Sequence, residues 1–209
     1  MNSHLLLTGT AAPSSPKVWA LQDSGLTVFH GLTKTARLFH FFLPQAIARG
    51  KQVLCLDGAN RFDPLLVARL ARQRGREPSE FYRRLRVARA FTCFQLTELL
   101  LRVPRIRGDF PAEILVVTAL PDLYFDEDVR EREAAASFRQ ALEALRALAR
   151  LPLPVAVFSD ASSLPTPRRS FFQQLTAQAN QVWKCTKQED GHLAFLSEKV
   201  GPHIQRLRP

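Results

Sequence analysis

Cysteine is scarce in this chain of 209 residues, and long apolar runs are missing altogether. The longest apolar stretch, residues 114–120, is far shorter than the roughly 20 residues of a membrane-spanning helix, and it suits a buried strand. The three cysteines, Cys55, Cys93 and Cys185, stand apart without metal-site spacing, which predicts free buried thiols in a reducing cytoplasm. The charged n-region of a secretory signal is also missing, so residues 1–17 are expected to form a flexible N-terminal arm.

Lysine is scarce too, because the net charge of +10 rests on 23 arginines and only 6 lysines. The charge is unevenly spread. Between Arg61 and Arg107 there are 12 arginines and 4 acidic residues, which gives a local charge of +8. Such clustering predicts a polyanion such as DNA, or an acidic protein, as the partner. The alternative is an arginine-favouring composition whose side chains line solvated helix faces.

Short apolar runs alternate with amphipathic stretches, which is typical of a mainly parallel α/β sheet flanked by helices. Residues 18–209 are expected to form one such domain, because no repeat or second boundary interrupts the order. Strands are expected at residues 26–29, 52–56, 85–90, 113–118 and 154–159, with a C-terminal β-hairpin at 181–186 and 192–197 around Glu189-Asp190-Gly191. Helices are expected at 34–49, at 65–74 after an Asp63–Pro64 cap, at 92–103 from a Thr92–Gln95 capping box, and at 131–150.

The stretch Gly31–Phe39 has part of the form of a nucleotide-binding P-loop. A working P-loop reads G-x-x-x-x-G-K-[ST], so that backbone N–H groups surround the phosphates while the lysine reaches them. If Lys34 and Thr35 are the K-[ST] pair, Thr33 and Val28 stand where the two glycines should be. Lys34 and Thr35 are therefore either a relic nucleotide-binding site at a helix N-terminus or an ordinary first helical turn.

Two segments, LDGANRFDPLLVARLARQRG and VARAF, resemble the core of RecA/RadA-type recombinases. That family carries an I-D-T-E-x-x-F-x-P-x-R-L segment, followed further along by A-R-A-F. The resemblance extends over residues 18–199 and implies a RecA-like P-loop fold. The matching positions here are Asp57, Phe62, Pro64, Ala88, Arg89, Ala90 and Phe91.

The same resemblance implies that the catalytic groups of the family have been replaced. The catalytic glutamate aligns with Ala59, the Walker B aspartate with Thr118, and the polar sensor residue falls near Ser159-Asp160. Phosphoryl transfer depends on positioning and on charge neutralisation by Mg²⁺, so these replacements remove the means of hydrolysis. We therefore expect a pseudo-ATPase that is not an enzyme and that uses neither a cofactor nor a metal ion.

Five arginines are candidate DNA contacts. Arg168 and Arg169 lie in a loop that is similar to a mobile DNA-contacting segment of recombinases, and Phe171 and Phe172 follow them. Arginines beside aromatic rings suit a single strand of DNA. The alternative is that both phenylalanines begin a helix packed on the sheet. The other three candidates are Arg83, Arg84 and Arg86.

The resemblance implies a non-catalytic recombinase paralogue that serves as an accessory factor in DNA repair or recombination. Its expected partners are DNA and either an active RecA/RadA-type recombinase or a translesion-polymerase complex, with no membrane contact and a cytoplasmic location. The alternative is a nucleotide-dependent ATPase or switch, in which Lys34 and Thr35 serve an atypical P-loop. That alternative predicts measurable ATP affinity.

Overall fold

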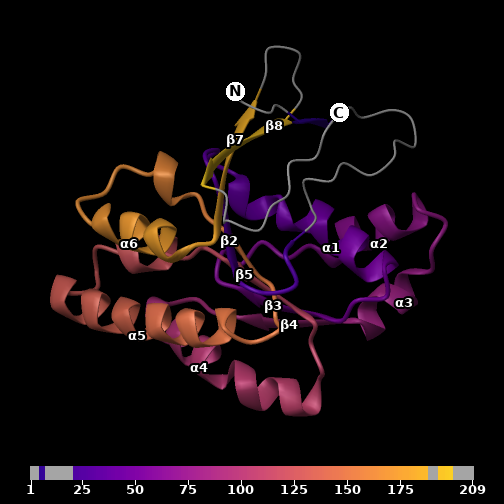
Figure 1. Cartoon of the computed structure of the whole chain (residues 1–209), viewed down its shortest axis with the longest axis horizontal. Coiled ribbons are helices and arrows are strands. Elements are labelled where there is room, and N and C mark those ends of the chain that lie inside the picture. The colour runs from indigo at the N-terminus through magenta and orange to yellow at the C-terminus, as the bar shows by residue number, and fades with distance from the viewer. Residues whose placement is uncertain (1–4, 8–20, 188–192, 200–209) are drawn as a thin grey trace.

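A computed structural model describes residues 5–7, 21–187 and 193–199, and within them eight strands form one mixed sheet (Figure 1). The strand order is β1-β8-β7-β2-β6-β5-β3-β4. The strands are β1 (Leu5–Leu7), β2 (Leu26–His30), β3 (Val53–Asp57), β4 (Leu85–Arg89), β5 (Ile114–Thr118), β6 (Val155–Phe158), β7 (Gln181–Lys187) and β8 (Leu193–Lys199).

The six strands from β7 across to β4 run parallel to one another. Every residue of β2, β3, β5 and β6 is buried, because helices cover both faces of the sheet. This is why these strands appear in the sequence as short continuous apolar runs. The edge strand β4 is only half-buried and carries two exposed arginines.

In the described residues six α-helices form two layers, with α1, α2 and α3 on one face of the sheet and α4, α5 and α6 on the other (Figure 1). The chain runs from β2 through β3 to β4 with its helices on the first face, then turns back through β5 and β6 to β7 with its helices on the second. Right-handed crossovers require this change of face when the direction reverses. The helices are α1 (Phe39–Ala48), α2 (Pro64–Arg72), α3 (Pro78–Arg83), α4 (Cys93–Asp109), α5 (Glu131–Ala149) and α6 (Ser170–Gln178).

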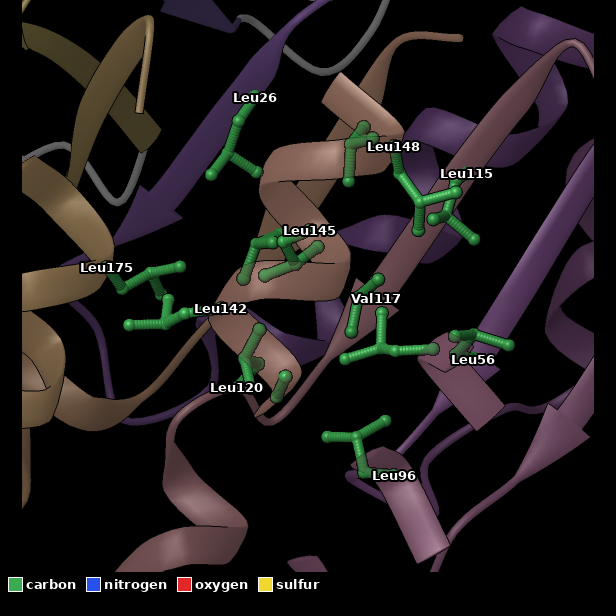
Figure 2. Packing of buried hydrophobic residues seen from close by; sticks show 14 of the residues in the cluster. Leu26, Leu56, Leu96, Leu115, Val117, Leu120, Leu142, Leu145, Leu148 and Leu175 are labelled. Atoms are coloured by element: carbon green, nitrogen blue, oxygen red, sulfur yellow. The ribbon is translucent and has the colours of Figure 1, made fainter. Parts of the chain in front are cut away.

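The larger hydrophobic cluster lies between the sheet and α4, α5 and α6 (Figure 2). The helix α5 contributes Leu142, Leu145 and Leu148, which share one side of the helix because they are three residues apart. They face strand residues such as Leu115 and Val117. The second cluster packs α1, α2 and α3 against the opposite face. It includes the fully buried Phe29 of β2 and Phe158 of β6, whose rings stack with their centroids 4.8 Å apart.

The capping residues in the sequence correctly predicted where α2 and α4 begin. The carboxylate of Asp63 accepts hydrogen bonds from the N–H groups of Leu65 and Leu66, with Pro64 as the first helical residue. Thr92 accepts one from Gln95, as the capping box predicts. The helix expected at 34–49 instead begins with a separate 3₁₀ turn, η2 (Thr35–Arg37), before α1.

The predicted C-terminal hairpin is confirmed as an antiparallel pairing of β7 with β8, and its expected turn at residues 189–191 lies outside the described residues. Within the predicted arm, residues 5–7 form β1, which pairs with β8, and the rest of residues 1–17 lies outside the description. All three cysteines are buried and free, as expected. Across the described part of the chain, no helix combines the length and apolar character needed to cross a membrane.

Candidate functional site

The loops after β2 and β6 meet at the carboxyl edge of the sheet. The two strands are neighbours, but the chain leaves β2 toward one face and β6 toward the other. Open α/β sheets bind their ligands in the crevice at such a point of reversal. Residues 31–35 and 159–163 are therefore the place where a nucleotide site would lie.

The first residue of the β2 loop must be glycine. Gly31 has a φ of +120°, and a Cβ atom there would lie 2.4 Å from the carbonyl oxygen of Cys185 in β7. The glycine therefore lets the loop pass close to the backbone of a neighbouring strand. Its role is packing against the protein itself, which differs from the role of a P-loop glycine that approaches phosphate.

Thr35 is buried in the protein, whereas Lys34 is exposed to solvent. The Thr35 hydroxyl is fully buried, donates to the carbonyl of Leu32 at 2.9 Å and accepts from the N–H of Leu32 at 2.8 Å. It thereby closes its own loop, which uses the hydroxyl that a P-loop would present to Mg²⁺. Lys34 is exposed. This arrangement corresponds to the ordinary first turn that was the alternative interpretation of the pair.

A carboxylate of the chain occupies the start of η2. The N–H of Ala36 donates to Asp160 Oδ1 at 2.9 Å, across 124 residues of sequence. Burial raises the pKa of Asp160, and hydrogen bonds from the backbone of Ala36 and Thr35, together with nearby Arg61, oppose that rise. The backbone donors that could receive an anion at this position are thus already directed at a side chain of the protein.

Asp160 is itself held by a second aspartate. Asp122 accepts from the Ser159 hydroxyl at 2.7 Å and from the N–H of Asp160 at 2.6 Å. Burial raises the pKa of Asp122 to about 6, and these two hydrogen bonds oppose the rise. Ser159 and Asp160, which the sequence resemblance aligns near a sensor position, therefore form a network internal to the protein.

Asp57, at the end of β3, organises the turn that follows it. It is fully buried and accepts from the N–H groups of Arg61 at 3.1 Å and Phe62 at 2.9 Å. The Thr118 hydroxyl donates to Asp57 at 3.1 Å and accepts from the N–H of Ala59 at 3.0 Å. Thr118 and Ala59, the positions aligned with the Walker B aspartate and catalytic glutamate, thus bond to each other and offer no carboxylate.

His30 links three elements at the same edge. Its Nδ1 lies 3.0 Å from the Ser162 hydroxyl and its Nε2 lies 2.9 Å from Glu198 in β8. Burial lowers the pKa of His30, and the hydrogen bond with Glu198 opposes that shift. Although the three residues have the composition of a nucleophile–base–carboxylate chain, only 4% of His30 is exposed, so we assign the contacts to holding β8 against the core.

Arg168 serves as a structural clamp. Its guanidinium donates to three backbone carbonyls in the connection from β5 to α5, those of Tyr124 at 2.9 Å, Asp126 at 2.7 Å and Val129 at 2.5 Å. Arg169, next to it, is exposed. Because these carbonyls occupy the Arg168 guanidinium, Arg169 is the more accessible of the two candidate DNA contacts.

The phenylalanines after these arginines pack inward. Phe171 is 7% exposed and stacks on Phe138 of α5 at 4.6 Å. Phe172 is partly buried and meets His30 edge-on at 5.0 Å. The alternative in which both rings begin a helix packed on the sheet is the one the structure shows, so these rings do not form a surface for bases.

The other candidate arginines lie away from this loop. Arg84 donates to the carbonyl of Gly50 at 2.6 Å, before the start of β3, and therefore marks the amino edge of the sheet. Arg86 lies over the ring of Phe110 at 4.8 Å, and Arg83 is exposed at the end of α3. The five candidates are thus divided between opposite edges of the sheet and do not form a single cluster.

The arginine-rich segment borders the β4 edge of the sheet. It comprises β4 itself, α2 and α3 on one face of the sheet and most of α4 on the other (Figure 1). Eleven of its 12 arginines are exposed, and Arg107 is half-buried. The uneven charge that the sequence shows is therefore also an uneven charge in space.

A cleft of about 580 Å³ lies at the amino edge of the sheet, remote from the loops after β2 and β6. Arg49, Arg107 and the ion pair of Lys51 with Glu113, at 2.8 Å, are among its lining residues. None of the seven candidate residues of the sequence lines it. We place the candidate site by the carboxyl-edge geometry, because the cleft does not contain the predicted residues.

Comparison of the chain with protein-family models and with curated proteins returns no match. The site rests on the geometry alone. Sequence reasoning did not find that Asp160 bonds to Ala36, because nothing local links residues so far apart. It could have found the exposed Phe94, since the capping box at Thr92 fixes where α4 begins and hence which side of the helix faces outward.

Proposed function

We propose that this chain is a non-catalytic RecA/RadA-like recombinase paralogue that acts as a DNA-binding accessory factor in DNA repair or recombination. The observation that carries the non-catalytic part is the hydrogen bond from the Ala36 N–H to the Asp160 carboxylate. A nucleotide phosphate would need that donor. It would also meet the negative charge of Asp160, and like charges about 4 Å apart repel by about 1 to 4 kcal/mol at the dielectric constants of water and of a protein surface.

Three further positions support the same proposal. The Thr35 hydroxyl is used inside its own loop, and the hydroxyl of Thr118 bonds to Asp57 where the family has a metal-binding carboxylate. Ala59 has no side chain that could polarise water. Phosphoryl transfer needs positioning of the phosphates, a metal ion and a catalytic base. Thr35, Thr118 and Ala59, which align with the residues for these three tasks, make contacts inside the protein instead.

The DNA-binding part rests on the charge of the segment between Arg61 and Arg107. Exposed arginines gathered around one edge of the sheet produce a positive field that attracts a polyanion. The protein partner under this proposal is an active recombinase or a translesion-polymerase complex, which the sequence resemblance supports. A protein that has kept such a fold without its catalytic groups is well suited to docking.

DNA affinity measured across a range of salt concentrations tests this function. We expect log K to fall linearly with log salt, because phosphate contacts release counterions. Replacing Arg83, Arg84 and Arg86 together with alanine should flatten the slope by about 2 for single-stranded DNA, at about 0.7 per phosphate contact. The measurement is fluorescence anisotropy with a labelled oligonucleotide, with and without Mg-ATP.

The matched control removes three exposed arginines of α5, Arg132, Arg139 and Arg146, which lie outside the arginine-rich segment. This variant should keep the wild-type slope. An affinity that does not change with salt would contradict DNA as the partner and would indicate a protein surface. A DNA affinity that requires Mg-ATP would contradict the non-catalytic proposal and favour the nucleotide-dependent switch.

A further inference from the structure

Two phenylalanines are exposed where the arginine-rich segment passes from β4 into α4. Phe91 is 61% exposed and Phe94 is 48% exposed, whereas Ala90 and Cys93 beside them are buried. Large apolar side chains that remain in solvent so close together in sequence indicate a contact surface. We call Phe91 and Phe94 the aromatic platform.

Two side-chain hydrogen bonds hold the backbone that carries the aromatic platform. The side-chain oxygen of Gln95 accepts from the N–H of Phe91 at 2.7 Å, and the Thr92 hydroxyl accepts from the N–H of Gln95 at 3.2 Å. Together the Thr92 cap and the bond from Phe91, the residue before it, to Gln95 fix the first turn of α4. Because the backbone is already ordered, binding on the two rings would cost little conformational entropy.

Arginines share the outward side of α4 with Phe94. Residues seven and eleven positions further along, Leu101 and Arg105, lie on the same side of the helix and are exposed. Phe94 and Arg105 are separated by about 16 Å along the axis, at 1.5 Å per residue. Arg102 is close by, although its Nε donates to Glu98 at 2.6 Å. The ring of Phe94 and the cation of Arg105 therefore lie on the same side of α4, one after the other along the helix axis.

We propose that single-stranded nucleic acid lies along the β4–α4 junction, with bases stacked on Phe91 and Phe94 and phosphates held by the neighbouring arginines. The inference rests on the proposed function, because it names the strand type and the contact residues of the same DNA binding. A single strand is favoured over a duplex because only unpaired bases expose the faces that aromatic rings stack upon. A single strand is favoured over an acidic protein because stacking rings and exposed arginines occur together here.

The test compares wild type with Phe91→Ala and Phe94→Ala in anisotropy titrations against a labelled oligothymidylate and a duplex of equal length. Each substitution should weaken single-strand binding by about tenfold, and duplex binding should be unchanged. The salt slope should also stay unchanged, because the phosphate contacts remain. The control is Phe41→Ala, which removes a phenylalanine of α1, outside the segment, that is 45% exposed and so matches Phe94 in exposure. Thermal unfolding of each variant confirms that it is folded.

Three results would overturn the inference. If wild type binds the single strand and both variants bind it equally well, the aromatic platform is not used and the proposed DNA binding stands. If the variants keep DNA affinity but lose capture of a purified RecA-type recombinase, the platform is a protein-docking surface. If wild type binds neither nucleic acid at low salt, the DNA part of the proposed function fails together with this inference.

Discussion

Replacing Asp57 with alanine is expected to lower the free energy of unfolding by about 3 to 5 kcal/mol, because three donors lose a buried charged acceptor and each loss costs about 1 to 3 kcal/mol. The carboxylate is fully buried and accepts from two backbone N–H groups and the Thr118 hydroxyl. Without it, the N–H groups of Arg61 and Phe62 lose their acceptor. Urea unfolding followed by circular dichroism measures the loss.

Two milder variants keep this prediction testable if Asp57→Ala does not fold. Asp57→Asn keeps one acceptor oxygen and should lose about half as much. Thr118→Val removes only the hydroxyl and should lose about 1 kcal/mol. A stability for Asp57→Ala within about 0.5 kcal/mol of wild type, the range of an ordinary surface substitution, would show that the turn does not depend on the carboxylate.

Arg168→Ala is expected to destabilise the protein by about 2 to 4 kcal/mol, because three carbonyl acceptors lose one charged donor. Arg169→Ala is the matched control, since the neighbouring arginine is exposed and its loss should change stability by no more than about 0.5 kcal/mol. Thermal and urea unfolding of the two variants, side by side, measure the difference.

The variants Arg168→Ala and Arg169→Ala also distinguish a structural role of Arg168 from a DNA contact. If Arg168 is a clamp, its loss affects stability first, and DNA affinity only through misfolding. A folded Arg168→Ala variant with wild-type stability and weakened DNA binding would contradict the structural role and support the contact that the sequence predicts. Loss of DNA affinity in Arg169→Ala alone would assign the phosphate contact to Arg169.

The central strands could be predicted from the sequence because burial on both faces makes each a continuous apolar run. The run at 113–118 corresponds to β5 and the run at 26–29 to β2, each to within one residue. The start of α1 could not be predicted in the same way. Thr35 closes its own loop with Leu32, so the regular helix begins only at Phe39. The hydrogen bonds of Thr35 therefore delay the start of the helix, although the apolar periodicity of residues 34–49 predicts an earlier one.

The candidate site was harder to predict than the fold, because its contacts join residues that are distant in sequence. Lys34 and Thr35 were identified by a local pattern, but their different orientations depend on the packing of the β2 loop. The partner of His30 is Glu198, 168 residues away, and no local signal indicates it. Phe171 and Phe172 are as apolar as Phe91 and Phe94, and the packing of α6 shows that Phe171 is buried and Phe172 partly buried. The exposure of Phe94, in contrast, follows from the capping box at the start of α4.

Calorimetric titration of the wild-type chain with Mg-ATP and Mg-ADP, beside Lys34→Ala, tests the central claim most directly. The claim is that Asp160 and the closed loop of Thr35 leave no place for a nucleotide phosphate. We predict no binding heat for wild type and an identical trace for the variant. Saturable binding by wild type that Lys34→Ala abolishes would contradict the account and would make a nucleotide-gated switch the function to pursue.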